Sequence, residues 1–185
     1  MEMINLTWDK YFLNIVNSVS SNSKCLSRQI GAVIVRDEKY IISTGYNGPP
    51  IGCSHCSDIQ YRDWLLKRAV LDGIECRLEG IEENTICPRR FMGFKSSEGM
   101  EYCQAAHAER NAIDIAARLG HSIEGCSMYL NCLIPCVECA KSIVNAGIRE
   151  VVVTELVDYE RKGITGREIL QKSYVQIRKY GNDEK

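Results

Sequence analysis

The chain has 185 residues, of which 45% are hydrophobic and 25% are charged, and its formal net charge is −1. This length suits a single folded domain, and no apolar run approaches the roughly 20 residues that span a bilayer. The start of the chain lacks the basic and apolar stretches of a signal peptide, so we expect a cytoplasmic protein without membrane partners. A near-neutral charge also disfavours a nucleic-acid surface, which needs clustered basic residues, but it permits a small phosphorylated ligand.

Ten cysteines are the most unusual feature of the composition. Disulfides are uncommon in a reducing cytosol, so cysteines at metal-ligand spacing indicate zinc binding. A free cysteine also packs as a small hydrophobic residue, and we interpret Cys76, Cys126 and Cys132 in that way. Only some of the ten are therefore expected to bind metal.

The first part of the chain predicts a helix followed by a hairpin. Apolar spacing over residues 8–20 indicates an amphipathic helix. Residues 31–35 and 40–44 indicate two strands, joined by a polar turn at 36–39. Turn-forming residues at 45–50 end the hairpin.

Residues 51–104 form a cysteine-rich insert. This stretch carries five of the ten cysteines, and apart from a predicted helix over 58–71 it lacks sustained periodicity. A long irregular segment inside a compact domain needs its own source of order. A bound metal would supply it.

The second part of the chain alternates between strands and helices. Strands that are separated by single helices imply crossover connections and a sheet covered on both faces. We therefore predict one α/β domain over residues 1–185. The predicted helices lie at 106–119, 136–146 and 165–173, and the predicted strands at 126–132, 151–153 and 174–178.

Two short motifs stand at the starts of two predicted helices: His107-Ala108-Glu109 and Pro135-Cys136-Val137-Glu138-Cys139. Cysteines three apart on a helix present both sulfurs on one face, and the free N–H groups and dipole of a first turn favour thiolates. His107 supplies a nitrogen as the third ligand. Three protein ligands leave the fourth tetrahedral position open, which is typical of a catalytic zinc.

Glu109 is the predicted catalytic residue beside this metal. Each motif residue alone has an ordinary structural interpretation, such as a helix cap or a redox pair. Together, the two motifs match the signature of the zinc-dependent nucleobase deaminases. In that chemistry the carboxylate takes a proton from the water that attacks C4 of cytosine, protonates N3, and then passes a proton to the departing amine.

A second group of candidate ligands lies outside the two motifs. Four cysteines can close a tetrahedral structural zinc site with a net charge of about −2. Such a site would tie the insert to the sheet, and the metal would supply folding energy. The alternative is that several of these residues are ordinary buried thiols. The set that we favour is Cys25, Cys56, Cys87 and Cys103, with Cys53 or His55 as substitutes.

With these motifs in hand, residues 6–155 resemble the deoxycytidylate (dCMP) deaminase family. The resemblance implies a three-layer α-β-α sandwich of the cytidine deaminase type, with a central mixed five-stranded sheet. It also implies zinc-dependent hydrolysis of dCMP to dUMP and ammonia, which feeds thymidylate synthesis. Beyond the zinc motifs it rests on Ser23-Lys24-Cys25 before residues 31–35, on Gly45-Tyr46-Asn47-Gly48, and on Cys87-Pro88-Arg89-Arg90 leading to Glu98-Gly99-Met100.

The resemblance further implies substrate contacts. Asn47 binds the deoxyribose, the Ala108 backbone N–H meets the cytosine O2, and Tyr159 binds substrate, although an ungapped alignment puts Val157 at that place. Members of the family are often hexamers, and some carry a second zinc in the insert. Some respond to dCTP, with Mg²⁺ as a partner of the nucleotide, and to dTTP. The residue that meets the phosphate is left open among Arg28, Arg89, Arg90 and Arg110.

Three other functions compete with this interpretation. A deaminase of another small molecule, such as cytidine, dCTP or a pterin-like ring, would share the zinc motifs. A deaminase of tRNA or single-stranded DNA should show a basic channel and aromatic stacking residues, and the neutral charge and the insert count against it. An inactive zinc-stabilised nucleotide sensor would have no use for the Glu109 carboxylate.

Overall fold

The computed structural model describes residues 7–75, 86–95, 97–160 and 162–181. Cys76, one of the three cysteines that we interpret as packing residues, lies outside these ranges. The other two, Cys126 and Cys132, are buried as predicted.

A mixed five-stranded sheet forms the centre of the fold, in the order β2-β1-β3-β4-β5. Strand β1 pairs antiparallel with β2 and with β3, whereas β3, β4 and β5 run parallel. The hairpin and the two crossovers confirm the predicted α/β class. The strands are β1 (Gly31–Arg36), β2 (Tyr40–Tyr46), β3 (Ser127–Leu130), β4 (Glu150–Val153) and β5 (Gln176–Lys179).

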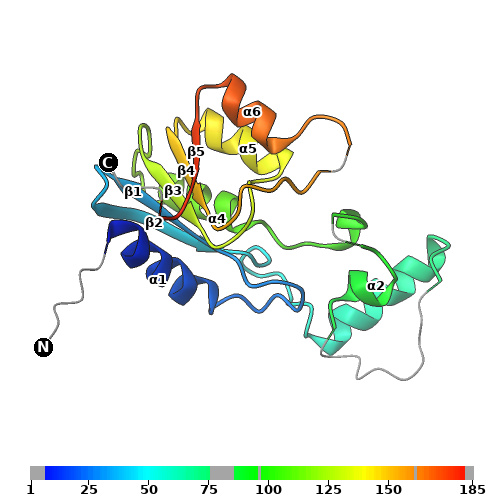
Figure 1. The fold of residues 1–185 in the computed structure, drawn as a ribbon. Coiled ribbons are helices and arrows are strands. Elements are labelled where there is room, and N and C mark those ends of the chain that lie inside the picture. Colours follow the sequence, from blue (N-terminus) through cyan, green and yellow to red (C-terminus); the bar gives the residue numbers. More distant parts are fainter. Residues whose placement is uncertain (1–6, 76–85, 96, 161, 182–185) are drawn as a thin grey trace, which may run out of the picture.

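Helices cover both faces of this sheet, which gives the predicted three-layer sandwich (Figure 1). Successive residues of a strand point to opposite faces, so β1 contributes to two cores. Val33 and Val35 pack with Phe12 and Val16 of α1 on one face. Ala32 and Ile34 belong to the larger core on the other face, beneath three helices. The four helices are α1 (Trp8–Ser20), α4 (Ala108–Arg118), α5 (Val137–Asn145) and α6 (Gly166–Lys172).

The insert forms a separate lobe beside the sandwich (Figure 1). It contains α2 (Ile59–Leu71), α3 (Pro88–Phe91) and the 3-10 turn η2 (Met100–Tyr102). Leu65, Leu66 and Ala69 of α2 pack with Phe91 and Met92 in a small apolar cluster of their own. The helix predicted over 58–71 is therefore confirmed, and Asp58 caps it by accepting from Tyr61 N at 3.0 Å.

Several predicted boundaries were wrong by a few residues for local reasons. Helix α4 begins at Ala108 and not at 106, because Ala106 forms a β-bridge with Gly48 and His107 is the N-cap. The last strand begins at Gln176 and not at 174. Tyr174 has a left-handed backbone with φ of 59°, and its N–H bonds the Gln171 carbonyl to close α6.

Close contact between β2 and α4 fixes the helix that carries two motif residues. A Cβ atom at Gly45 would lie 2.3 Å from the backbone nitrogen of Ala112. Ser43 of the same strand donates a buried hydrogen bond of 2.7 Å to the Ala112 carbonyl. Only glycine allows the strand and the helix to approach so closely, and this approach sets the height of the α4 N-terminus over the sheet.

Candidate active site

The two motifs meet at the N-termini of α4 and α5. His107 and Cys136 are the N-cap residues of these helices, and Cys139 lies in the first turn of α5. Nδ1 of His107 lies 3.4 Å from Cys136 Sγ and 3.3 Å from Cys139 Sγ. In a tetrahedral zinc site the bond lengths give about 3.6 Å between nitrogen and sulfur ligands. The observed spacing therefore fits zinc with only small shifts.

The two cysteines of this group differ strongly in acidity. A hydrogen bond from the Cys139 side chain, assisted by one from His107, lowers the pKa of Cys136 to about 4. The same bond, together with burial, raises the pKa of Cys139. Cys136 is thus favoured as a thiolate without a metal. A bound cation would replace the proton that Cys139 shares with Cys136.

Glu109 lies beside the three ligands in the first turn of α4 and is 4% exposed. Burial raises the pKa of its carboxyl group, while the neighbouring His107 and a hydrogen bond from Cys139 act in the opposite direction. A carboxyl group with a raised pKa holds a proton more readily than an exposed glutamate does, which suits a group that must both accept and return a proton. This is the behaviour expected of a residue that shuttles protons.

These residues line a cavity of about 510 Å³. The predicted substrate contacts Asn47, Ala108 and Tyr159 all line it as well. Val157, the alternative to Tyr159, is half exposed and is absent from the cavity wall. The structure thus brings every predicted residue of the first site into one cavity. All four candidate phosphate-binding arginines also line it: Arg28, Arg89, Arg90 and Arg110.

Tyr159 closes one side of the cavity. Its hydroxyl lies 3.5 Å from Nη1 of Arg28, whose guanidinium stands 5.8 Å from the centre of the ring. Burial, and then the fields of Cys132 and Glu109, raise the pKa of the Tyr159 hydroxyl. The phenol therefore stays neutral and can serve as a donor to a ligand.

The cavity wall also contains residues that were not predicted from the sequence, among them Glu160 and Cys132. Glu160 accepts a hydrogen bond of 2.8 Å from the backbone nitrogen of Val137 and so caps the helix that carries Cys139. Cys132 was interpreted only as a packing residue, yet it also lines the cavity. Neither belongs to a motif. The only sequence signal for Glu160 was its place one residue after Tyr159.

The second cysteine set lies around the insert, but the structure does not draw it into a finished metal site. Cys87 is buried, while Cys25, Cys56 and Cys103 are half-buried, and Cys53 is exposed. Over the described part of the chain, His107, Cys136 and Cys139 are the only three potential ligands whose binding atoms all lie within 4.8 Å of one another. The second zinc therefore stays a prediction.

The site combines a His-Cys-Cys group of the catalytic type with a buried glutamate. Together with a mixed sheet covered by helices, these features define the zinc-dependent deaminase class. A known family of proteins matches most of the chain. Residues 6–155 match the "Cytidine and deoxycytidylate deaminase zinc-binding region", and the chain belongs to this family.

Relatives agree with this assignment, and a solved structure shares the fold. The chain is 40% identical over 157 residues to the deoxycytidylate deaminase of Enterobacteria phage T4, which covers 82% of this chain and 79% of the relative. It is 33% identical over 176 residues to the mouse deoxycytidylate deaminase, covering 95% and 80%. The fold matches the cyanophage S-TIM5 dCMP deaminase in complex with dCMP and dUMP, with a TM-score of 0.60, 22% identity and coverage of 92% and 94%.

Proposed function

We propose that this protein is a zinc-dependent hydrolase that converts dCMP and water into dUMP and ammonia. The observation that carries the proposal is the placement of buried Glu109 beside His107, Cys136 and Cys139 in one cavity. Relatives named deoxycytidylate deaminase at 33–40% identity favour dCMP over other cytosine compounds.

The protein's own residues would perform the proton transfers. Zinc held by His107, Cys136 and Cys139 would act as a Lewis acid that makes a water molecule more acidic. Glu109 would take a proton from this water while the water oxygen bonds to C4 of the pyrimidine. Glu109 would then deliver that proton to N3. As the bond between C4 and the exocyclic nitrogen breaks, Glu109 would pass the second proton of the water to the departing amino group, which leaves as ammonia.

Backbone and side-chain groups would orient the base. Ala108 is the first residue of α4, so its N–H has no acceptor within the helix. This N–H is available to the cytosine O2, as the resemblance implies. Asn47, on the cavity wall, would donate to a deoxyribose hydroxyl, and the neutral Tyr159 hydroxyl would provide a further donor.

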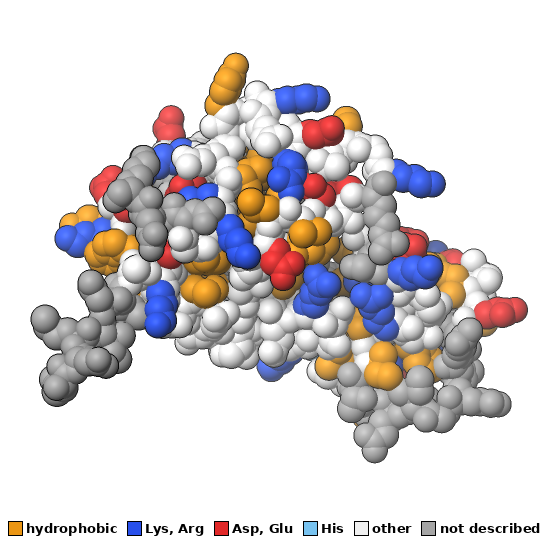
Figure 2. Space-filling view, in the orientation of Figure 1, with side chains coloured by type: hydrophobic (Ala, Val, Ile, Leu, Met, Phe, Trp, Pro, Cys, Tyr) orange, Lys and Arg blue, Asp and Glu red, His pale blue; other side chains and the backbone are white. Residues whose placement is uncertain are grey.

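A nucleic-acid substrate receives less support. The face drawn in Figure 2 shows basic and acidic side chains interspersed, unlike the continuous basic channel that single-stranded nucleic acid needs. No helix in the described part of the chain is long and apolar enough to cross a membrane. A cytoplasmic location forms part of the proposal, because free thiols such as those of Cys136 and Cys139 persist in a reducing compartment.

Ammonia release from a panel of substrates tests the proposal. We expect dCMP to be preferred over cytidine, deoxycytidine and dCTP, and over an oligonucleotide that contains cytosine. Glu109→Gln should retain zinc and lose on the order of 1,000-fold or more in kcat. Glu38→Gln is the matched control, because Glu38 is exposed, pairs with Arg149 and lies outside the cavity wall. Absence of activity on dCMP in the zinc-loaded protein would refute the proposal.

A second, structural zinc held by Cys25, Cys56, Cys87 and Cys103 belongs to the same proposal. Burial, with further contributions from Cys103, Cys87 and Cys25, raises the pKa of Cys56 to about 11, which supports a shared region for the four thiols, although no three of their sulfur atoms lie within 4.8 Å of one another.

Arg62 provides an independent argument for negative charge in this region. Its side chain is 1% exposed, and Nη1 donates at 2.7 Å to the carbonyl of Ile86, the neighbour of Cys87. Nε and Nη2 are buried and find no acceptor among the described residues. A four-thiolate zinc centre of charge about −2 would compensate this buried cation.

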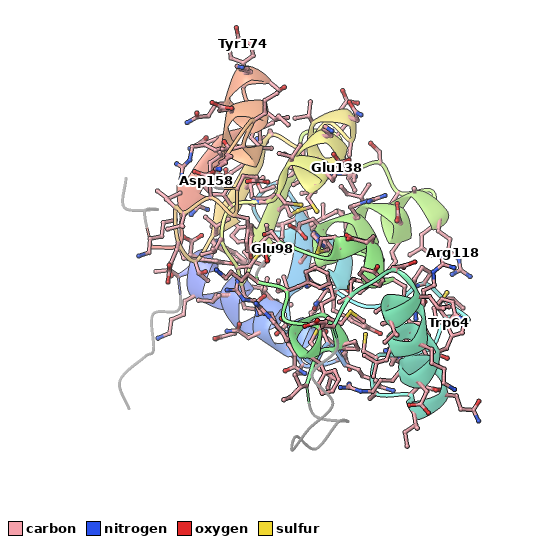
Figure 3. The ribbon with its side chains drawn as sticks, turned by 90° about the vertical axis from the view of Figure 1, so that its right-hand side faces the viewer. Trp64, Glu98, Arg118, Glu138, Asp158 and Tyr174 are labelled. Carbon is pink, nitrogen blue, oxygen red and sulfur yellow. The ribbon has the colours of Figure 1, made fainter. Side chains whose placement is uncertain are left out.

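We extend the proposal to a hexamer that dCTP activates, with Mg²⁺ as the partner of the nucleotide, and that dTTP inhibits. Exposed apolar side chains on the insert support assembly. Trp64 is 60% exposed and Leu71 is 83% exposed, and Figure 3 shows Trp64 at the outer edge of α2. Native mass spectrometry would give the number of subunits and the zinc ions per chain together. One zinc per chain would exclude the second site, and hyperbolic kinetics unaffected by dCTP would exclude the activation.

A further inference from the structure

The segment that follows β4 lies alongside the loop that carries two of the metal ligands. In Figure 1 it belongs to the orange connection between β4 and α6. The backbone nitrogen of Ile134 donates to the Val157 carbonyl at 3.1 Å, and that of Val137 donates to Oε1 of Glu160 at 2.8 Å. The two donors and the two acceptors have the same spacing along the chain, so the segments run side by side in the same direction. A shift of one segment therefore displaces the other.

Helix α5 is not capped by the side chain of its own N-cap residue. An N-cap side chain commonly accepts from a free N–H of the first turn, but the N-cap residue here is Cys136, and within the described ranges it forms no such bond. Its sulfur belongs to the metal-binding group with His107 and Cys139. Glu160 supplies an acceptor instead, to the N–H of Val137, which lies between the two cysteines. The cap of the metal-binding turn therefore comes from outside the motif.

The Glu160 carboxylate is enclosed at this helix end. Its Oε2 atom is excluded from solvent and finds no donor among the described residues, so in that part of the chain Val137 N is its only hydrogen-bond partner. Burying a carboxylate costs free energy unless hydrogen bonds or opposite charge compensate it. The first turn of a helix offers both, because its N–H groups are free and carry partial positive charge. The position of Glu160 is therefore set by α5 and not by solvent.

Tyr159 lies between two anchored neighbours. Asp158 pairs with Arg167 of α6, with 2.9 Å between Oδ2 and Nε, and Figure 3 shows Asp158 beside that helix. Arg167 also donates at 2.7 Å to the Leu156 carbonyl. On the other side of Tyr159, Glu160 is bound to α5. Tyr159 itself lines the cavity. Two helices therefore fix the backbone on either side of the residue that would contact the substrate.

We propose that Glu160 is a positioning residue that couples the substrate-binding Tyr159 to the metal-binding turn of α5. Its bond to Val137 fixes the turn between the two cysteine ligands, and the same bond fixes the backbone next to Tyr159. This inference rests on the proposed function, because it takes zinc to bind at the α5 turn and substrate to contact Tyr159. It goes beyond that function by naming the residue through which the two sites respond to each other.

Zinc affinity, measured by competition with a chelator, tests the metal half of the proposal without any substrate. Glu160→Ala removes the acceptor for the Val137 N–H, and it should weaken zinc binding on the order of 10-fold, as loss of an outer-shell partner does. Glu160→Gln keeps an oxygen for this bond, so its zinc affinity should stay close to wild type. Glu155→Ala is the matched control, because Glu155 is exposed in the same segment and lies outside the cavity wall.

Steady-state kinetics with dCMP at saturating zinc test the substrate half. In Glu160→Ala the KM for dCMP should rise on the order of 10-fold, because the Tyr159 hydroxyl loses its fixed position. A double-mutant cycle with Tyr159→Phe separates this effect from a general loss of stability. In the Tyr159→Phe background, Glu160→Ala should raise KM much less, since the group that it positions is already gone. All measurements are made well below the melting temperature of each variant.

An unchanged zinc affinity in Glu160→Ala would overturn the proposal, whatever the substrate. Equal losses in Glu160→Gln and Glu160→Ala would also overturn it, because the hydrogen bond to Val137 would then not be what matters. The same holds if the effects of Glu160→Ala and Tyr159→Phe on KM are independent. If the wild-type protein fails to deaminate dCMP, the proposed function fails, and the zinc measurement still decides whether Glu160 acts on the metal-binding turn.

Discussion

Asn47 and Arg28 are joined by a hydrogen bond of 2.9 Å from the Asn47 side-chain nitrogen to the Arg28 carbonyl oxygen. The amide oxygen of Asn47 accepts a bond of 2.8 Å from Ile30 N, and it shares the Ser23 hydroxyl, 2.8 Å away, with the Asn47 backbone carbonyl, 2.7 Å away. The amide nitrogen uses one N–H on the Arg28 carbonyl, so its second N–H is left for a ligand. Asn47 can therefore donate to a sugar hydroxyl, and it also fixes the loop that carries Arg28.

Asn47→Asp should impair both folding and turnover. The substitution puts an oxygen opposite the Arg28 carbonyl and removes the remaining donor, which costs about 1–3 kcal/mol for the unsatisfied buried acceptor. We expect a lower melting temperature and a fall in kcat/KM for dCMP on the order of 100-fold. Ser21→Ala is the control, since within the described ranges this exposed hydroxyl bonds only the Ser18 carbonyl of its own helix end. Kinetics equal to wild type in Asn47→Asp would contradict the dual role.

Glu109 should make the metal-free protein less stable as the pH rises. Its pKa in the folded state is raised above the ordinary 4.5 by burial. The folded state therefore binds the proton more tightly than the unfolded state, and stability falls as the pH increases from about 4.5 through the higher folded pKa. Glu109→Gln cannot ionise, so its gain in stability over wild type should increase with pH. Urea unfolding of the metal-free proteins at pH 5 and pH 8 measures this, and an equal difference at both values would contradict it.

The ion pair between Asp9 and Arg178 joins the first helix to the last strand. Nη1 and Nη2 of Arg178 lie 2.6 and 2.9 Å from the two Asp9 oxygens, and Nε lies 2.9 Å from Glu150. Asp9 is 2% exposed. Asp9→Ala should destabilise the fold by about 3–5 kcal/mol, because it leaves a buried charge with fewer partners. Denaturant unfolding checks the value.

Arg149→Ala is the matched control for this prediction. Arg149 also pairs with a glutamate, Glu38, at 3.4 Å, but both side chains are more than half exposed. An exposed pair contributes at most about 1 kcal/mol. Equal losses in Asp9→Ala and Arg149→Ala would show that burial does not govern the strength of the ion pair in this protein.

The grouping of the candidate catalytic residues could be predicted from the sequence because the spacing within each motif is local. Cys136 and Cys139 share one helix end, and His107 and Glu109 share another, so the spacing within each motif already fixes two ligands or a ligand and its base. The buried strands were predictable for a similar reason. Their apolar runs, such as residues 31–35, depend on period and burial and not on distant partners.

The insert and the substrate end of the cavity could not be predicted in the same way. The pattern around Arg89 gives no sign that its Nη1 is held by the Glu98 carbonyl, nine residues later. The capping of α5 by Glu160 depends on a contact across 23 residues of sequence. Such contacts are decided by tertiary packing, which a periodicity or a motif does not encode.

Gly166 sets the position of the metal-binding loop, and its substitution gives the last prediction. A Cβ atom at this position would lie 1.8 Å from the carbonyl oxygen of Pro135, the residue before Cys136. Gly166→Ala must therefore push α6 away from the loop or displace Cys136, and overpacking of this kind typically costs about 1–3 kcal/mol or more. We expect a lower melting temperature and faster release of zinc to a chelator.

Gly48→Ala is the control, because a Cβ there would lie 3.7 Å from the nearest atom, an ordinary contact with the Tyr46 ring. Its melting temperature should stay within a few degrees of wild type, since a change below about 0.5 kcal/mol shifts the transition little. If Gly166→Ala releases zinc as slowly as Gly48→Ala while its melting temperature falls, the contact between α6 and Pro135 stabilises the fold without positioning the ligands. If neither property changes, the loop tolerates the extra methyl group and the close approach has no energetic consequence.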